Sequence, residues 1–342
     1  MLRIAYLGPE GTFTEAALLK ISASGLVPGS DSPDGITPIA TESTPAALAA
    51  VRSGDADYAC VPIENSIEGS VLPTLDNLAT GTPLQIFAEL TLDVSFTIVV
   101  RRGTPAAKVA TVAAFPVAAA QVRHWLTQHL PNAQVVPANS NAAAAYDVSN
   151  GRADAGVSTA LAAERYGLTA LATDVVDEPN ARTRFVLAGP PGAPPSRTGA
   201  DRTSVVLHLD NAPGALVSAL TEFAIRDIDL TRIESRPTRK ELGTYFFFLD
   251  CVGHIDDEAV AEALKALHRR CAGVRFLGSW PTGSAAGAAP PRLDEASRWL
   301  TRLREGKRDW PADIGPTRTV ARQRRPSPRH PASGGGADRP RP

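Results

Sequence analysis

Residues 180–185 (NARTRF) bring two arginines, a threonine hydroxyl and an aromatic ring together within six positions. Arginine side chains hold carboxylates, and a hydroxyl can donate a hydrogen bond to a departing oxygen. The run 185–188 that follows is apolar and predicts a strand, so the polar group would lie at a strand entrance. This combination suits an enzyme that acts on a small anionic substrate. The alternative is an ordinary loop with solvated arginines, and other segments have to decide between the two.

A second polar group, formed by Glu64, Asn65 and Ser66, follows the apolar run 56–61, which predicts another strand. Asn and Ser are favoured as helix N-caps, which explains Ser66 well and Glu64 poorly. The group therefore indicates either a helix start or a binding site at a strand end.

A glycine-rich turn over residues 8–13 (GPEGTF) separates a predicted strand over 3–7 from a predicted helix over 13–21. Thr12 and Glu15 have the spacing of a capping box. Glycines let the backbone approach a ligand, and a helix N-terminus offers N–H donors to an anion. The turn is neither a P-loop nor a dinucleotide fingerprint, so it does not imply a nucleotide.

Charge is distributed unevenly along the chain. The 342 residues carry a net charge of −1, but residues 281–342 hold 13 Lys and Arg against 6 Asp and Glu, a net charge of +7. The first 280 residues hold 22 against 30, a net charge of −8. An acidic body argues against nucleic acid as the main partner. The basic tail predicts a solvated extension, with binding of an acidic partner as the alternative.

Cys60, Cys251 and Cys271 each lie among apolar residues and lack metal-binding spacing. This is typical of reduced thiols in a cytoplasmic protein. The six histidines are scattered, so we expect no metal site. The sequence predicts no signal peptide and no apolar run of membrane-spanning length, so we expect no membrane partner.

Strand-like and helix-like segments alternate over residues 1–188, which predicts an α/β fold. Residues 54–57 (GDAD) and 151–154 (GRAD) each follow a predicted helix and enter a short strand. This internal echo favours two related lobes, and two-lobed bodies bind small anions between the lobes. The remaining expected elements are a helix to 53 N-capped by Thr44, a strand over 93–100, helices over 118–129 and 142–148, a strand over 154–157, and a helix opened by Ser158 and closed by Gly167.

Residues 189–202 are rich in Pro and Gly and predict a linker. Residues 203–280 show the order strand, helix, strand, strand, helix, strand, about the size of a ferredoxin-like domain. Residues 281–342 predict a mostly disordered tail with one helix over 294–304, whose Trp299 and Leu300 could dock elsewhere.

Four segments in this order resemble prephenate dehydratase: residues 8–13 (GPEGTF), 63–71 (IENSIEGSV), 160–168 (ALAAERYGL) and 180–185 (NARTRF). The resemblance covers roughly residues 1–280. It implies a two-lobed, periplasmic-binding-protein-like catalytic domain over 1–188 and an ACT regulatory domain over 203–280.

The resemblance implies a carbon–oxygen lyase that converts prephenate to phenylpyruvate in phenylalanine biosynthesis, with loss of water and carbon dioxide. Aromatisation of the ring drives this step, so no cofactor and no metal are expected. Thr183 is implied as the catalytic hydrogen-bond donor to the departing oxygen. Whether it transfers the proton itself stays open.

The resemblance also implies a set of substrate contacts. Arg184 is expected to bind a carboxylate or to form a salt bridge between the lobes, and Phe185 to wall the ring site or to pack in the core. For Ser158 the alternative is plain helix N-capping. The other residues expected to line the cleft are Thr12, Glu64, Asn65, Ser66, Gln121 and Thr159.

The chain departs from the family pattern Ser-His-Pro-Gln-Ala-Leu-Ala-Gln in one segment. Residues 114–121 (AFPVAAAQ) keep Gln121 but place Ala114 and Phe115 in the serine and histidine positions. A role for that serine therefore does not apply to this chain.

Two motifs of the ACT domain imply feedback control by L-phenylalanine. A ligand held between two ACT domains can bias a quaternary equilibrium, so a homodimer or homotetramer is expected. Turn formation is the alternative for Asn211 and Gly214. The implied effector site consists of Asn211, Gly214, Ala215, Leu216, Glu234, Ser235 and Arg236.

Two other functions stay open at this stage. One is an arogenate dehydratase, because the sequence does not locate the pocket for the single amino group that distinguishes arogenate from prephenate. The other is a non-catalytic sensor of amino acids or aromatic acids. A pure sensor needs no leaving-group donor, so Thr183 argues against it, and no helix-turn-helix pattern is evident.

Overall fold

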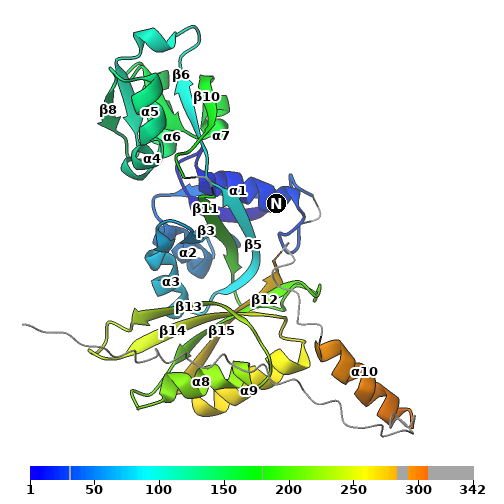
Figure 1. Ribbon diagram of the computed structural model, residues 1–342. Coiled ribbons are helices and arrows are strands. Elements are labelled where there is room, and N and C mark those ends of the chain that lie inside the picture. The colour runs from blue at the N-terminus through cyan, green and yellow to red at the C-terminus, as the bar shows by residue number, and fades with distance from the viewer. Residues whose placement is uncertain (31, 179, 283–291, 307–342) are drawn as a thin grey trace, which may run out of the picture. The chain divides into compact units, whose positions relative to one another are not determined.

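The structure is a computed structural model and describes residues 1–30, 32–178, 180–282 and 292–306 (Figure 1). The chain divides into two compact units, residues 1–290 and 291–342. Three sheets form the first unit. None of the described helices combines the length and apolar character needed to cross a membrane.

The first lobe is built on a mixed sheet in the order β2-β1-β3-β11-β5. The first three strands are parallel, whereas β11 runs antiparallel to both of its neighbours. Its strands are β1 (Leu2–Leu7), β2 (Ile36–Thr41), β3 (Tyr58–Asn65), the short β4 (Gly69–Ser70) beside β3, β5 (Gln85–Asp93) and β11 (Arg182–Gly189), and its helices are α1 (Phe13–Ala23), α2 (Thr44–Ser53) and α3 (Leu72–Ala79).

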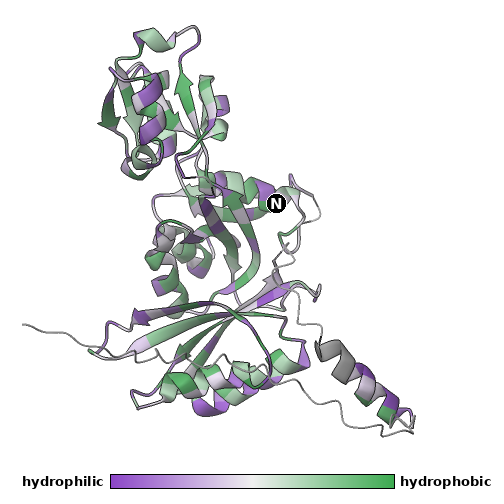
Figure 2. Ribbon diagram, viewed as in Figure 1, coloured by the Kyte–Doolittle hydropathy of each residue, from purple (hydrophilic) through white to green (hydrophobic). Residues whose placement is uncertain are grey.

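The second lobe repeats this plan in the order β10-β6-β9-β7-β8. Its β6, between β10 and β9, is buried over its whole length and appears green in the hydropathy colouring of Figure 2. The strands are β6 (Phe96–Val100), β7 (Thr111–Ala114), β8 (Gln134–Pro137), β9 (Ala155–Ser158) and β10 (Thr169–Val175), and the helices are α4 (Pro116–Gln121), α5 (Arg123–His129), α6 (Asn141–Ser149), α7 (Ala160–Arg165) and the 3-10 helix η1 (Ala106–Lys108).

The internal echo in the sequence corresponds to a repeated contact. Asp57, just before β3, accepts a hydrogen bond of 2.7 Å from the backbone N–H of Arg3 at the start of β1. Asp154, just before β9, accepts one of 3.0 Å from the backbone N–H of Thr111 at the start of β7. In both lobes the aspartate fixes the start of the neighbouring parallel strand.

The third sheet has the order β13-β14-β12-β15, and all its neighbours are antiparallel. The predicted strand and helix order is confirmed: β12 (Asp201–His208), α8 (Ala215–Ala224), β13 (Leu230–Pro237), β14 (Tyr245–Val252), α9 (Glu258–Arg270) and β15 (Gly273–Pro281). One face of this sheet packs on α8 and α9 through an apolar core that includes Leu207, Phe223 and Leu249.

The other face of the third sheet packs on the first lobe. Phe248 and Trp280 belong to one apolar cluster with Ile86 and Val186 of the first lobe. Gly278 has φ +136, and a Cβ there would lie 2.2 Å from the carbonyl oxygen of Ile86. Only glycine therefore lets β15 approach β5 this closely.

Several local predictions differ from the structure. The predicted strand 93–100 is β6, which begins only at Phe96, and β5 (Gln85–Asp93) was not predicted. The predicted helix 118–129 is two helices that meet at Val122, which has φ −124. Ser43, one residue before the predicted Thr44, caps α2, because its side chain accepts from the N–H of Ala46.

In the second unit, the predicted helix is α10 (Arg292–Arg304). The rest of the predicted tail, residues 283–291 and 307–342, lies outside the described residues.

Candidate active site

Alternation along β11 sends neighbouring side chains to opposite faces of the first-lobe sheet. Phe185 is 2% exposed and packs in the apolar cluster beneath α1. Arg184 points to the opposite face, toward the third sheet, where it meets Asp250. Thr183 is half-buried and lies on the Phe185 side of the strand.

The hydroxyl of Thr183 is held by Asn65, its partner on β3. The Asn65 amide nitrogen donates to Thr183 Oγ1 over 2.8 Å. The amide oxygen of Asn65 accepts from the backbone N–H groups of Ile67 and Glu68 at 2.9 and 3.0 Å. These two bonds fix the orientation of the amide, since only the oxygen can accept. Thr183 Oγ1 therefore accepts from Asn65, and its own hydrogen is available to another acceptor.

Arg184 is engaged by carboxylates of the protein. Its guanidinium lies 2.8 Å from Asp250, 3.2 Å from Glu64 and 3.4 Å from Glu89, and the residue is 9% exposed. Burial alone would lower the pKa of Arg184, but Asp250 and Glu89 raise it above its ordinary value. The Arg184–Asp250 salt bridge joins the first lobe to the third sheet. The salt bridge between the two lobes that the sequence offered as an alternative is not the one observed. Glu64 is likewise a partner of Arg184.

Ser66 and Arg182 clamp the segment that enters β11. The Ser66 hydroxyl donates to the carbonyl of Asn180 and accepts from the N–H of Arg182, at 3.2 and 2.8 Å. Arg182 forms an exposed ion pair with Asp93 over 2.8 Å. The chain crosses between the lobes twice near these residues. It leaves the first lobe after β5, which ends at Asp93, and returns from the second lobe after β10, which ends at Val175.

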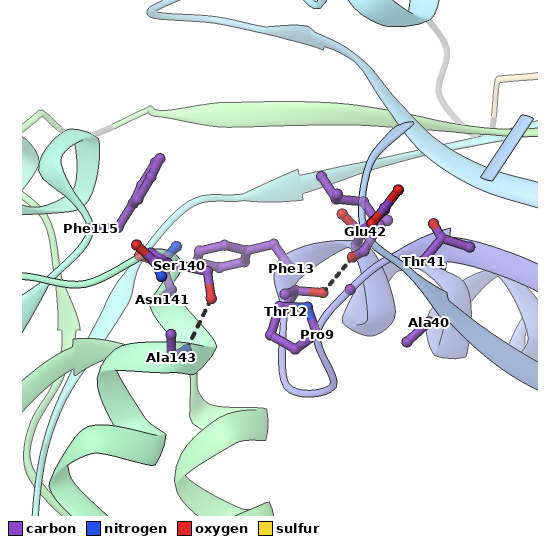
Figure 3. A pocket seen from close by; sticks show the side chains of 14 residues that line it. Pro9, Thr12, Phe13, Ala40, Thr41, Glu42, Phe115, Ser140, Asn141 and Ala143 are labelled. Carbon is purple, nitrogen blue, oxygen red and sulfur yellow. Dashed lines mark hydrogen bonds between the residues drawn. The ribbon is translucent and has the colours of Figure 1, made fainter. Parts of the chain in front are cut away.

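A cavity of about 650 Å³ lies between segments of the two lobes. Figure 3 shows Thr12 and Glu42 on the first-lobe side, Phe115 and Ser140 on the second-lobe side, and the ring of Phe13 between them. Thr12 is the one predicted contact residue among those that line this cavity. Its hydroxyl donates to the carbonyl of Leu7 and accepts from the N–H of Glu15, the first half of the predicted capping box.

Sequence reasoning missed most of the second-lobe wall of this cavity, namely Asn139, Ser140, Asn141 and Ala143. Ser140 caps α6 by accepting from the N–H of Ala143 over 2.9 Å. Ser140 is the N-cap of α6 as Thr12 is of α1. A comparison of the helix starts in the two lobes could therefore have indicated this part of the cavity. The N-termini of α1 and α6 both face the cavity, and helix N-termini favour anions.

Thr183 and Asn65 do not line the cavity, but they lie at the same end of the first-lobe sheet as the cavity. The cavity contacts Leu7 and Thr41, the last residues of β1 and β2. β3 runs parallel to β1, so its last residue, Asn65, lies at the same edge of the sheet. Thr183 pairs with Asn65.

The hydroxyls of Ser158 and Thr159 are both buried and used by the protein. Ser158 donates to the carbonyl of Asn141 over 2.6 Å, so it supports the cavity wall. Thr159, and not Ser158, caps α7, and it also donates to the carbonyl of Gly11 in the first lobe over 2.6 Å. The cap lies one residue later than predicted, because Ser158 is still paired in β9.

Two further residues lie near the lobe junction, Gln121 buried and Arg165 exposed. Gln121 is 8% exposed, and its Oε1 atom has no hydrogen-bond partner among the described residues. Arg165, in the ALAAERYGL segment, pairs with Glu10 over 3.1 Å and with Glu15. The pair ties α7 of the second lobe to α1 of the first.

Two family models and one close relative establish what this chain resembles. The model for prephenate dehydratase matches residues 4–192, and the model for the ACT domain matches residues 203–269. A prephenate dehydratase of Mycobacterium sp. (strain JLS) is 76% identical over 307 residues, which is 90% of this chain and 97% of the relative. This chain belongs to the prephenate dehydratase family.

Solved structures agree with this family. A prephenate dehydratase from Arthrobacter aurescens, in complex with L-Phe, superposes with a TM-score of 0.77 at 42% identity, covering 89% of this chain and all of that one. GqqA, a quorum quenching acylase, superposes with a TM-score of 0.70 at 29% identity, covering 82% and 98%. The Mycobacterium relative is 76% identical and is matched over 97% of its length, so the activity is that of a carbon–oxygen lyase acting on prephenate.

The predicted effector residues of the ACT domain fall on two faces. Gly214 adopts φ +79 and precedes α8, which starts with Ala215 and Leu216. The side chains of Glu234 and Arg236 contact the first lobe, through Ser70 at 3.1 Å and Asp76 at 3.0 Å.

Ser235 lies between Glu234 and Arg236 on β13 and is exposed. Asn211 is exposed in the turn before α8. The side chains that remain accessible to an effector are therefore on the turn and at Ser235.

Proposed function

We propose that Thr183 is the hydrogen-bond donor of the prephenate dehydratase reaction and that Asn65 orients it. Departure of the ring carboxylate as carbon dioxide supplies the electron pair that expels the ring hydroxyl and leaves an aromatic ring. A donor aimed at the departing oxygen stabilises the developing charge by about 3–4 kcal/mol in a dry site. The observation that carries this proposal is the Asn65–Thr183 hydrogen bond of 2.8 Å, because it leaves the Thr183 hydrogen free for the substrate.

The cavity between the lobes is our proposed prephenate site. The N-termini of α1 and α6, next to Thr12 and Ser140, would receive the two carboxylates of the substrate. Phe13 and Phe115 offer apolar surface to the ring. We assign Ser66, Ser158 and Thr159 to holding the walls of the site, Phe185 to the core beneath Thr183, and Gln121 to the lobe junction.

A turnover assay tests this function directly. Purified protein is incubated with prephenate or with arogenate, and phenylpyruvate and phenylalanine are quantified. We expect prephenate to be turned over faster. Faster release of phenylalanine from arogenate would contradict the assignment, and binding of prephenate without turnover would favour the sensor.

We propose L-phenylalanine as the effector, bound at the turn before α8 by Asn211, Gly214, Ala215 and Leu216 together with Ser235. The support is the L-Phe complex of the Arthrobacter relative and the left-handed backbone of Gly214, which exposes N–H groups at the start of α8. Glu234 and Arg236 would act by tying β13 to the first lobe.

Gly214→Val is expected to raise the phenylalanine concentration for half-inhibition at least about tenfold, because valine strains a φ of +79. Inhibition curves at fixed prephenate measure this. Gly103→Val, at an open turn of the second lobe with φ +80, carries a matched strain and should leave the inhibition curve in place. An unchanged curve for Gly214→Val would contradict the effector site.

We propose that the ACT domain joins two copies of the chain. Four apolar side chains of this domain are exposed: Val217 on α8 (67%), Ile225 directly after α8 (65%), Ile233 on β13 (52%) and Tyr245 on β14 (43%). Among the strands that the structure describes, β13 is also an edge strand, with one side unpaired. Exposed apolar groups of this kind mark association surfaces.

Ile233→Glu should shift the assembly toward monomer, because a charge is placed on the association surface. Light scattering coupled to size exclusion measures the mass. Val135→Glu, at a 44% exposed valine of the second lobe, is the matched control. A mass that stays at the wild-type value in Ile233→Glu would contradict the proposed association surface.

The three free cysteines support a reducing compartment, and we propose the cytoplasm.

A further inference from the structure

Asp250 of the ACT domain is the centre of a buried ionic network. It is 1% exposed in the middle of β14. Its Oδ2 atom accepts from Arg184 at 2.8 Å and from Arg232 at 2.9 Å. Its Oδ1 atom accepts from Arg232 at 3.0 Å and from Ser204 at 2.6 Å. One carboxylate therefore joins β12 and β13 of the ACT sheet to β11 of the catalytic domain.

A second carboxylate makes the reciprocal connection. Glu89 of β5 is 7% exposed and accepts from Arg202 of β12 at 2.7 and 2.5 Å. It also accepts from the indole N–H of Trp280 at 3.0 Å. Glu89 lies 3.4 Å from Arg184, so both carboxylates share that guanidinium.

The network keeps its charges in a region that excludes water. Burial alone would raise the pKa of Asp250, but Arg232 and Arg184 lower it well below its ordinary value. Asp250 is therefore ionised across the working pH range. Removing one partner of such a pair leaves an uncompensated buried charge, which is strongly unfavourable. The guanidinium of Arg184 would move toward the remaining carboxylates.

A movement of Arg184 would displace Thr183 directly, because the two residues are neighbours on β11. The Cα atoms of Arg184 and Thr183 are adjacent, so they lie about 3.8 Å apart. Thr183 must keep its register with Asn65 to hold the hydrogen bond of 2.8 Å. A displacement of about 1 Å at a reacting group can lower a rate about 100-fold.

We propose that Asp250 is a positioning residue for catalysis: by holding Arg184, the ACT domain fixes the strand on which Thr183 meets its substrate. The inference rests on the proposed role of Thr183. It also gives the effector a physical route, because Arg232 lies on β13, the strand that carries Ser235. Occupancy of the effector site would be transmitted through Arg232 and Asp250 to Arg184 and Thr183.

The test is a double-mutant cycle on the full-length protein. Asp250→Asn keeps the shape of the side chain and removes its charge. We expect kcat to fall about tenfold to 100-fold while the KM for prephenate stays within about threefold. In a Thr183→Ala background the same substitution should change kcat less than about twofold, because the group that it positions is gone.

Asp76→Asn is the matched control. Asp76 holds Arg236 and Arg239 across the same interface at 3.0 and 2.6 Å, without contact to β11. Loss of the Asp76 charge weakens the contact between the ACT domain and the first lobe without altering the partners of Arg184. We therefore expect kcat of Asp76→Asn to stay within about twofold of wild type. Melting curves are recorded for every variant. If Asp250→Asn does not fold, Ser204→Ala removes one donor to Asp250 and should lower kcat by a smaller factor, about twofold to fivefold, at unchanged KM.

The outcomes separate this inference from the proposed function. If Thr183→Ala turns over like wild type, the role of Thr183 fails. If Thr183→Ala is slow but Asp250→Asn, or Ser204→Ala in its place, keeps the wild-type kcat, the positioning role of Asp250 fails alone. Equal and additive losses in both backgrounds, or an equal loss in Asp76→Asn, would also overturn it, since they would reflect general destabilisation.

Discussion

Replacing Thr183 with alanine is expected to lower kcat by about 10²–10³, with a KM for prephenate within about threefold of wild type. The hydroxyl is proposed to interact with the departing oxygen as charge develops, so its loss affects the transition state more than the bound substrate. Steady-state formation of phenylpyruvate measures both constants. Thr183→Ser keeps the hydroxyl and should stay within about tenfold of the wild-type kcat.

Thr169→Ala is the matched control for this substitution, because Thr169 lies exposed on the edge strand β10 of the second lobe. It should turn over like wild type. An unchanged kcat in Thr183→Ala would refute the donor role, and a loss seen only in KM would move Thr183 to ground-state binding.

Asn65→Asp is expected to lower kcat by about 100-fold. The new carboxylate can still accept from the N–H groups of Ile67 and Glu68, as Asn65 does at 2.9 and 3.0 Å. A carboxylate has no hydrogen to donate, so the Thr183 hydroxyl would donate to it and turn away from the substrate. The single change of one amide nitrogen to oxygen thus reverses the direction of the hydrogen bond.

Kinetics of Asn65→Asp are compared with those of Asn150→Asp, which adds the same charge after α6 in the second lobe. The control should retain the wild-type kcat. A wild-type kcat in Asn65→Asp would show that the direction of the Asn65–Thr183 bond is irrelevant to turnover. In that case Asn65 would have only the structural role of holding residues 67 and 68.

The order of elements could be read from the sequence because local signals agreed with the fold. Thr12 caps α1 as its spacing with Glu15 predicts, and Gly54 ends α2 in the left-handed conformation. The repeated aspartates Asp57 and Asp154 indicated two lobes, and each does the same work at a strand start. Patterns of this kind depend on neighbours in the chain, which a sequence displays directly.

Long-range partners could not be read in this way. β5 was not predicted, because Glu89 interrupts its apolar run, and Glu89 is buried where Arg202 and Trp280 of the ACT domain reach it. For Arg184 the sequence left open a substrate carboxylate or a salt bridge, and it could not identify the protein carboxylates that the structure places beside it. Its partner Asp250 lies 66 residues further on, in another domain.

The residues of the candidate site that belong to recognisable sequence motifs could be predicted. Most residues that form the second-lobe side of the cavity belong to no such motif and were not predicted. Asn65 and Thr183 were both chosen, and their hydrogen bond joins positions 118 residues apart. The roles of Ser158 and Thr159 were harder to predict, because a hydroxyl before a helix can face a ligand, the helix or a neighbouring carbonyl. Both donate to carbonyls, of Asn141 and Gly11.

The most direct measurement of the donor role is the single-turnover rate of Thr183→Val beside Thr183→Ser at saturating prephenate. Valine matches threonine in shape and lacks the hydroxyl, and single turnover isolates the chemical step from product release. We predict that Thr183→Val is slower than wild type by about 10²–10³ and that Thr183→Ser stays within about tenfold. A Thr183→Val protein that converts prephenate at the wild-type single-turnover rate would contradict the account.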